Sequence, residues 1–208
     1  MPVAVLAESL QLRIPLIAVA STPGDGPRPC VRCGSRGLNV HQRTRKRVKD
    51  PQVAYALVVR YLCKRCGHVG RSYPAGLGAG RQSASLQHLS VLLYWLGLSY
   101  GRVREVLIEL GCPLSTTSIR RNVEATRESL TATPPLTRLR LEPRGGGLLR
   151  GPDGMLALRL LQPLPSERLL EAEIAPGPGA AELRWRLETC AVWLARIFHP
   201  GAYPPGSA

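Results

Sequence analysis

Two short motifs, Cys30-Val-Arg-Cys33-Gly34 and Cys63-Lys-Arg-Cys66-Gly67, decide the fold expected between residues 28 and 75. Two cysteines separated by two residues can direct both sulfur atoms at one metal ion, and the glycine that follows permits the positive φ that such a turn needs. Four thiolates would form a closed, tetrahedral site for a structural Zn²⁺. The alternatives are two disulfides or four unrelated thiols, and the paired spacing favours zinc over both. The predicted ligands are Cys30, Cys33, Cys63 and Cys66.

The 29 residues between Cys33 and Cys63 indicate a hairpin. From Gln52 to Tyr61, apolar and aromatic residues recur at every second position, which is typical of a strand. We expect a partner strand near residues 37–42, which makes the intervening residues a basic hairpin tip. Such a tip can follow a phosphate backbone, and the alternative is a solvated loop. The cations of the tip are Arg43, Arg45, Lys46, Arg47 and Lys49.

The charge of the chain is concentrated around these motifs. The 208 residues carry a formal net charge of +14, and residues 28–82 hold 13 of the basic residues and a single acid, Asp50. A dense block of one sign is typical of an interaction surface or a disordered tail, and the cysteines within it argue against a tail. The excess favours an anionic partner, most simply nucleic acid, and argues against a free-standing enzyme with a carboxylate-rich site.

Three predicted helices follow the glycine-rich residues 76–82, which we expect to be a flexible linker. The helices begin near Ala84, after Ser99 and after Ser115, and glycines end the first two. This pattern predicts a helix-turn-helix over residues 83–131, with the third helix reading DNA; the alternative is a bundle used for packing or dimerisation. Hydroxyls and Arg side chains suit phosphates and base edges. The predicted DNA-contacting residues of this helix are Ser115, Thr116, Thr117, Arg120 and Arg121.

The remaining segments carry weaker signals. Strands are expected at 136–141, 155–161 and 168–174, followed by a helix at 180–198 and a flexible tail at 199–208. Residues 1–27 show no signal peptide, and the chain has no apolar run of the roughly 20 residues needed to span a membrane. We therefore expect a cytoplasmic protein without membrane contact, whose cysteines are reduced.

Several of these motifs occur in an order that resembles a known family. The two CxxC motifs are followed by Tyr73-Pro74, by Gly-Arg-Gln at 80–82, by Leu-Leu-Tyr-Trp-Leu-Gly-Leu-Ser-Tyr at 92–100 and by Ser-Thr-Thr-Ser-Ile-Arg-Arg at 115–121. Together they resemble the N-terminal DNA-binding part of bacterial insertion-sequence transposases with a DDE, RNase H-like catalytic domain. The resemblance covers about residues 28–130.

The resemblance also bears on residues 136–198. It implies that they are the first part, βββα, of an RNase H-like domain. Three carboxylates of such a domain hold two Mg²⁺ ions for phosphoryl transfer. Here the first available acid is Glu142, and no motif places a second or third acid beside it. The later strands of the domain are missing as well, which would leave a sheet edge that can pair with a second copy of the chain.

The sequence thus predicts an α+β protein made of a zinc ribbon, a helix-turn-helix and a partial RNase H-like segment. We expect it to bind double-stranded DNA sequence-specifically in the nucleoid, to depend on structural Zn²⁺, and to act on no small molecule. We expect no independent catalytic activity, which fits either a transposase remnant that retains DNA binding or a truncated reading frame without a role. Two alternatives are a DDE transposase subunit completed in trans, which would use Mg²⁺, and an RNA-binding zinc ribbon.

Overall fold

The computed structural model describes residues 10–20, 22–23, 28–50, 52–128, 142–145, 147–151, 154–161 and 167–198. This part of the chain contains four helices and two β-sheets, which confirms the α+β class. The chain divides into two compact units, one formed by Ile17–Leu86 and the other by Met1–Leu16 together with Gln87–Ala208. Each unit is described by itself.

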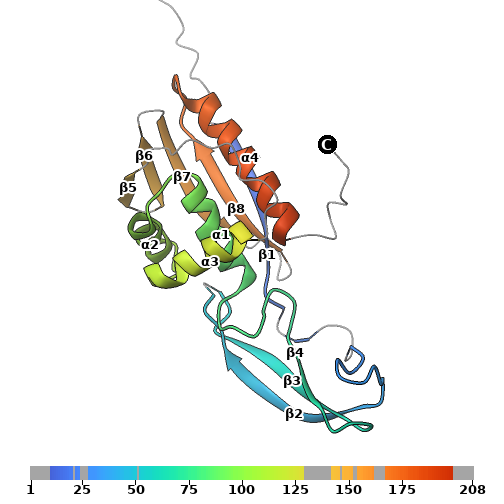
Figure 1. Ribbon diagram of the computed structural model, residues 1–208. Coiled ribbons are helices and arrows are strands. Elements are labelled where there is room, and N and C mark those ends of the chain that lie inside the picture. Colours follow the sequence, from blue (N-terminus) through green and yellow to red (C-terminus); the bar gives the residue numbers. More distant parts are fainter. Residues whose placement is uncertain are drawn as a thin grey trace, which may run out of the picture. The chain divides into compact units, whose positions relative to one another are not determined.

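The unit Ile17–Leu86 is built on an antiparallel sheet with the order β2-β3-β4 (Figure 1). Its strands are β2 (Leu38–Arg47), β3 (Tyr55–Cys63) and β4 (Val69–Ser72). One small apolar cluster packs at the end of the sheet away from the cysteines, and its members are Val19, Val48, Ala56 and Leu77, with Val53 against them. Other buried apolar side chains of this unit are Val58, Val59 and Leu86. A core of this size supplies modest hydrophobic stabilisation, to which a bound metal can add.

The basic residues lie in strand β2 and not at a hairpin tip, which corrects our prediction. Strand β2 continues to Arg47, whose partner across the ladder is Tyr55, so the turn is formed by residues 48–54. The carboxylate of Asp50 accepts the N–H groups of Gln52 and Val53, which fixes the turn at that point. Alternation of apolar residues located β3 but did not show how far β2 extends, because β2 is exposed along most of its length.

The residues 76–82 are packed against the sheet, which corrects the expectation of a flexible linker. Leu77 is buried in the apolar cluster. The ammonium of Lys46 donates to the carbonyls of Gly78 and Ala79 at 3.1 and 2.6 Å, and the main-chain N–H of Lys49 donates to the carbonyl of Arg81 at 2.7 Å. The glycine content of this segment predicted a flexible backbone. The hydrogen bonds that hold it come from residues some 30 positions away in the sequence, so the local sequence does not reveal them.

The second unit contains a five-stranded sheet with the order β1-β8-β7-β6-β5. Its strands are β1 (Leu10–Ile17), β5 (Glu142–Gly145), β6 (Leu148–Gly151), β7 (Gly154–Leu161) and β8 (Glu167–Ile174), and α4 (Ala180–Phe198) follows. Strands β7 and β8 and helix α4 lie where the sequence predicted them. The predicted strand 136–141 and the tail 199–208 fall outside the described residues, and the β5–β6 hairpin was not predicted.

Strand β1 lies beside β8 at one edge of this sheet, although residues 1–27 had no predicted element. Its side chains Ile14 and Leu16 are buried, and Arg13 pairs with Glu171 of β8 at 3.4 Å. The sequence suggested that the sheet edge would be open to a second copy. The edge of β8 is instead occupied by a strand of the same chain.

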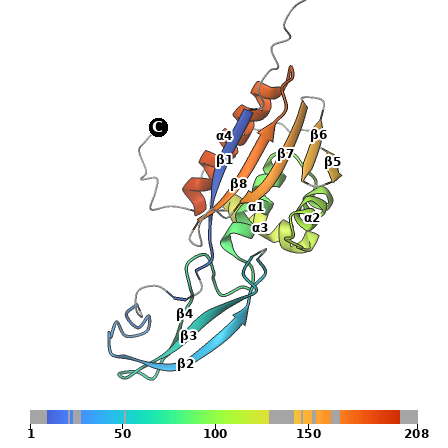
Figure 2. The same ribbon diagram turned by 180° about the vertical axis from the view of Figure 1, so that it is seen from behind.

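The helices lie on one side of the five-stranded sheet (Figure 1). In the opposite view the other side of the sheet faces the reader (Figure 2). Side chains therefore alternate along the strands between a buried and a more exposed face. The buried positions include Leu156 and Leu158 of β7 and Leu170 and Ile174 of β8.

The three helices between β4 and β5 begin where the sequence predicted, and the first two also end there; the predicted end of the third lies outside the described residues. They are α1 (Ala84–Trp95), α2 (Tyr100–Glu109) and α3 (Thr116–Glu128). The hydroxyls of Ser99 and Ser115 accept main-chain N–H groups three residues later, which caps α2 and α3. Gly97 and Gly111, with φ of +98° and +73°, end the helices before these caps. The capping and terminating residues confirm this part of the sequence analysis.

Candidate metal centre and candidate nucleic-acid interface

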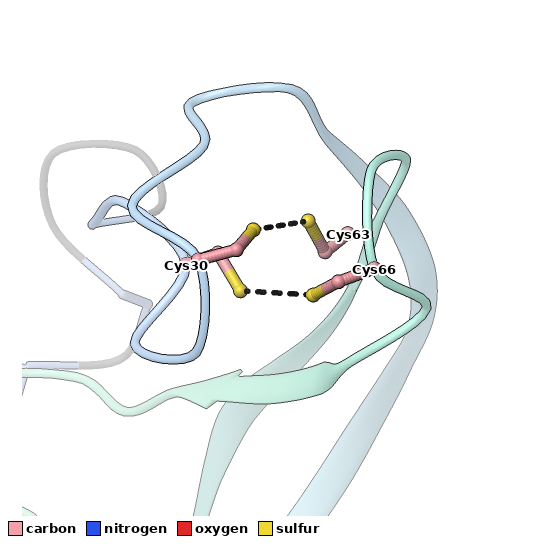
Figure 3. A group of neighbouring side chains, drawn as sticks. Cys30, Cys63 and Cys66 are labelled. Carbon is pink, nitrogen blue, oxygen red and sulfur yellow. Dashed lines mark hydrogen bonds between the residues drawn. The ribbon is translucent and has the colours of Figure 1, made fainter.

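The four predicted cysteine ligands come together in one cluster. Their sulfur atoms all lie within 4.8 Å of one another, with 3.7 Å between those of Cys30 and Cys66 and 3.6 Å between those of Cys33 and Cys63 (Figure 3). Zinc–sulfur bonds of about 2.3 Å in a tetrahedron place sulfur atoms about 3.8 Å apart. All four thiols are free of disulfides, so the cluster has the ligand number and spacing that a Zn²⁺ site requires.

The two cysteine loops have the same main-chain geometry. Gly34 and Gly67 both have a φ of +68°, and their N–H groups donate to the carbonyls of Cys30 and Cys63 at 2.8 and 3.0 Å. In each loop, the first cysteine also donates its own N–H to the carbonyl five residues later, at 2.9 Å. The turn requires a left-handed conformation at both glycines, and this conformation is unfavourable for a residue with a side chain. The repeated CxxCG sequence therefore produces a repeated turn that directs two sulfur atoms inward.

The hydrogen bonds of the second loop favour a thiolate. The main-chain N–H of Cys66, with help from that of Arg65, lowers the pKa of Cys63 to about 6. The N–H of His68 likewise favours the Cys66 thiolate, but burial and the three neighbouring sulfur atoms oppose it and raise the pKa of Cys66 to about 12. A cation placed among the sulfur atoms would remove this opposition, because it offsets the charge that accumulates as the thiols ionise.

This cluster is the one group of three or more metal-ligating side chains in the described part of the chain. Four cysteines leave no coordination position for a substrate, which is typical of a structural site. The side chain of His68 is not a member of the cluster, and its main-chain carbonyl accepts the N–H of Cys63. The arrangement could hold a metal ion such as zinc, and it does not itself identify the metal.

The predicted cations of β2 lie on both faces of the strand. Arg43, Arg45 and Arg47 alternate along it, so they share one face, where Val59, Leu57 and Tyr55 are their cross-strand partners. All three Arg side chains are exposed. The guanidinium of Arg45 lies 4.9 Å from the centre of the Tyr55 ring, an arrangement that orders the side chain by a cation–π contact.

Lys46 belongs to the opposite face and is engaged within the protein. Its ammonium binds two carbonyls of the 76–82 segment and lies 4.7 Å from the centre of the Tyr73 ring. It is therefore less available to a phosphate than the three Arg residues. Lys49 follows the end of β2, and its side chain is exposed while its main chain pairs with the segment around Gln82. Nothing in the sequence distinguished Lys46 from its neighbours in this respect.

Helix α3 presents most of its predicted contact residues to solvent. Thr116, Thr117 and Arg121 are exposed, while Ile119 and Val123 are buried. The Ser115 hydroxyl caps the helix, accepting the N–H of Ser118 at 3.2 Å. Arg120 pairs with Glu124 at 3.4 Å on the exposed face. The helix therefore has a polar outer face whose first turn is rich in hydroxyls.

Glu142, the first acid available for a catalytic site, is the first residue of β5. It is exposed and pairs with Arg144 at 3.7 Å. Within the described residues, no cluster of carboxylates that could hold a metal includes it.

Comparisons with models of protein families, with curated proteins and with solved structures gave no match for this chain. Among the described residues, no helix is both long enough and apolar enough to cross a membrane.

Proposed function

We propose that the chain is a zinc-dependent, sequence-specific DNA-binding protein. In this proposal residues 28–75 are a zinc ribbon, and residues 83–131 are a helix-turn-helix whose third helix, α3, reads bases. Bound zinc would hold the two cysteine loops together and would supply much of the folding free energy of this small unit.

The observation that carries the proposal is the exposed basic face of β2. Arg43, Arg45 and Arg47 lie at alternate positions on a strand, so their spacing of about 6.6 Å is fixed by the backbone. The single acid between residues 28 and 82, Asp50, has its carboxylate oxygens bound to Gln52, Val53 and Ser85. The Arg side chains therefore lack a nearby carboxylate partner from their own segment, and phosphate groups can take that place.

Helix α3 supplies the second half of the proposal. Thr116 and Thr117 offer hydroxyls in the first turn, and Arg121 can form two hydrogen bonds to guanine. The exposed Arg120–Glu124 pair is of the kind that contributes about 0.3–0.5 kcal/mol, so a DNA contact can replace it at small cost. These residues would give the protein its sequence preference, while β2 would supply affinity without sequence information.

The resemblance to insertion-sequence transposases supplies the proposed origin. In that view residues 136–198 serve packing or assembly, and the chain binds DNA without cutting it. This origin rests on the motifs of residues 28–130 alone.

The test is a fluorescence-anisotropy titration of purified protein with labelled duplex DNA at several salt concentrations. Metal content is measured in parallel, before and after chelation. We expect one zinc ion per chain, an affinity that falls steeply with salt, and loss of binding when zinc is removed. A duplex affinity that hardly changes between 50 and 200 mM salt would contradict the proposal.

The same titration separates the remaining alternatives. Competition by structured RNA at a lower concentration than duplex DNA would favour an RNA-binding zinc ribbon. Cleavage of a strand with Mg²⁺ or Mn²⁺, lost in Glu142→Ala, would favour a transposase subunit completed by another chain.

A further inference from the structure

The cysteine loops carry a second group of cations that the predicted DNA contacts do not include. We define the cysteine end as residues 30–37 and 63–68. Arg32 lies between the first pair of cysteines, Lys64 and Arg65 lie between the second pair, and Arg36 follows the first loop. All four side chains are exposed. The N–H of Lys64 donates to the carbonyl of Gly37 at 2.9 Å, which holds the two loops, and their cations, side by side.

These four cations exceed what a metal centre needs for charge balance. Four thiolates around one Zn²⁺ carry two net negative charges, so Arg32, Arg36, Lys64 and Arg65 leave an excess of two positive charges. Among the described residues of the unit Ile17–Leu86, the one acid is Asp50, which lies beyond the opposite end of β2 and does not compensate this excess. The cysteine end is therefore positive even with the metal bound, and an anionic partner would be attracted to it.

The spacing of the two basic groups fits a DNA duplex. Strand β2 begins at Leu38, next to the cysteine end, and its first cation is Arg43. The intervening five steps of about 3.3 Å place the two groups about 17 Å apart. That distance exceeds the width of the major groove, about 12 Å, so the groups can reach the two phosphate backbones that border it. The β2 residues between them, Asn39, Val40, His41 and Gln42, carry no formal charge. Arg60 of β3 lies across from Gln42 and donates to its side-chain oxygen at 3.0 Å.

We propose that the cysteine end is a second phosphate-binding surface, and that it contacts one DNA backbone while Arg43, Arg45 and Arg47 contact the other. This inference rests on the proposed function, since it names a further part of the same interface. It assigns the CxxC loops two tasks: their cysteines bind metal, and the residues between the cysteines bind phosphate.

The test compares three double variants, each of which removes two positive charges. Arg32→Gln/Arg65→Gln alters the cysteine end and Arg43→Gln/Arg45→Gln alters β2. The control, Arg150→Gln/Arg159→Gln, removes exposed charges from the five-stranded sheet. For each protein, zinc content and the dependence of duplex affinity on salt are measured.

We expect Arg32→Gln/Arg65→Gln to bind zinc normally and to lose about 1.8 from the slope of log K against log salt, with an affinity about 30-fold weaker at 150 mM salt. The β2 variant should show a similar loss and the control almost none. Arg32→Lys/Arg65→Lys should retain the wild-type slope, because it keeps the charge. If the glutamine variant loses zinc, Arg36→Gln/Lys64→Gln takes its place with the same expected result.

An unchanged slope in the cysteine-end variants, together with a reduced slope in the β2 variant, would overturn this inference and leave the proposed function standing. A wild-type protein without salt-dependent duplex binding would overturn both. An equal loss in the control would also overturn the inference, because net charge alone would then explain the effect.

Discussion

Strand β1 provides the sharpest test of the five-stranded sheet, because nothing in the sequence predicted it. Ile14 is 2% exposed within the edge strand that lies beside β8. Truncating a buried Ile to Ala costs about 2–5 kcal/mol, and an edge position that can partly close over the cavity falls at about 2–3 kcal/mol. Since a domain of this size shifts by about 2–4 °C per kcal/mol, we expect the Tm of Ile14→Ala to fall by about 4–12 °C.

The assay is urea and thermal unfolding followed by tryptophan fluorescence. All three tryptophans, Trp95, Trp185 and Trp193, belong to the unit that contains this sheet, so the signal reports on that unit and not on the unit Ile17–Leu86. The matched control is Gln11→Ala in the same strand, where the side chain is exposed and the loss should stay within about 0.5 kcal/mol. If Ile14→Ala were as stable as Gln11→Ala, β1 would not be part of the folded sheet in solution.

Three further variants address particular contacts. Gly147→Ala should destabilise the unit with the five-stranded sheet by more than Gly145→Ala. Both glycines have positive φ, but of the two only Gly147 would bring a Cβ into collision with a carbonyl of β7. Equal losses in the free energy of unfolding in urea would contradict this prediction. Asp50→Ala should destabilise the unit Ile17–Leu86 by about 1–3 kcal/mol and speed amide exchange at Gln52 and Val53, since both N–H groups lose their acceptor. Unchanged protection at these amides would refute that role of Asp50. Burial raises the pKa of Cys190 from 9.0 to about 12, so this thiol ionises at a lower pH in the unfolded chain and the free energy of unfolding should decline between these pH values. Cys190→Ala should remove this decline. A decline that persists in the variant would belong to other groups.

Local chemistry in the sequence predicted the cluster of four cysteines and the capping and terminating residues of the helices. A CxxCG motif contains within five residues everything that its turn needs, and a serine after a glycine is sufficient to end one helix and cap the next. For the same reason β7, β8 and α4 were placed correctly, since a strand or helix with one buried face shows its period in its own residues. None of these features depends on a distant partner.

The DNA contacts remain predictions, and the structure changes which of them are most available. Arg43 and Lys46 look alike in sequence, but Arg43 is on the exposed face of β2, whereas Lys46 binds the carbonyls of Gly78 and Ala79. Alternation along a strand follows from the sequence once the strand is known. Which of the two faces is covered depends on segments that pack there later in the chain.

The sequence by itself determined the α+β class, the four cysteines that meet, and the concentration of positive charge around them. Only the tertiary structure decided that residues 10–17 occupy the edge of β8, that the basic residues continue strand β2, and that residues 76–82 are fixed against the sheet. The physical reason is the range of the interactions. Turns, caps and periodicity are encoded within a few residues, whereas strand pairing and burial depend on partners far apart in the chain, whose selection reflects the free energy of the whole fold.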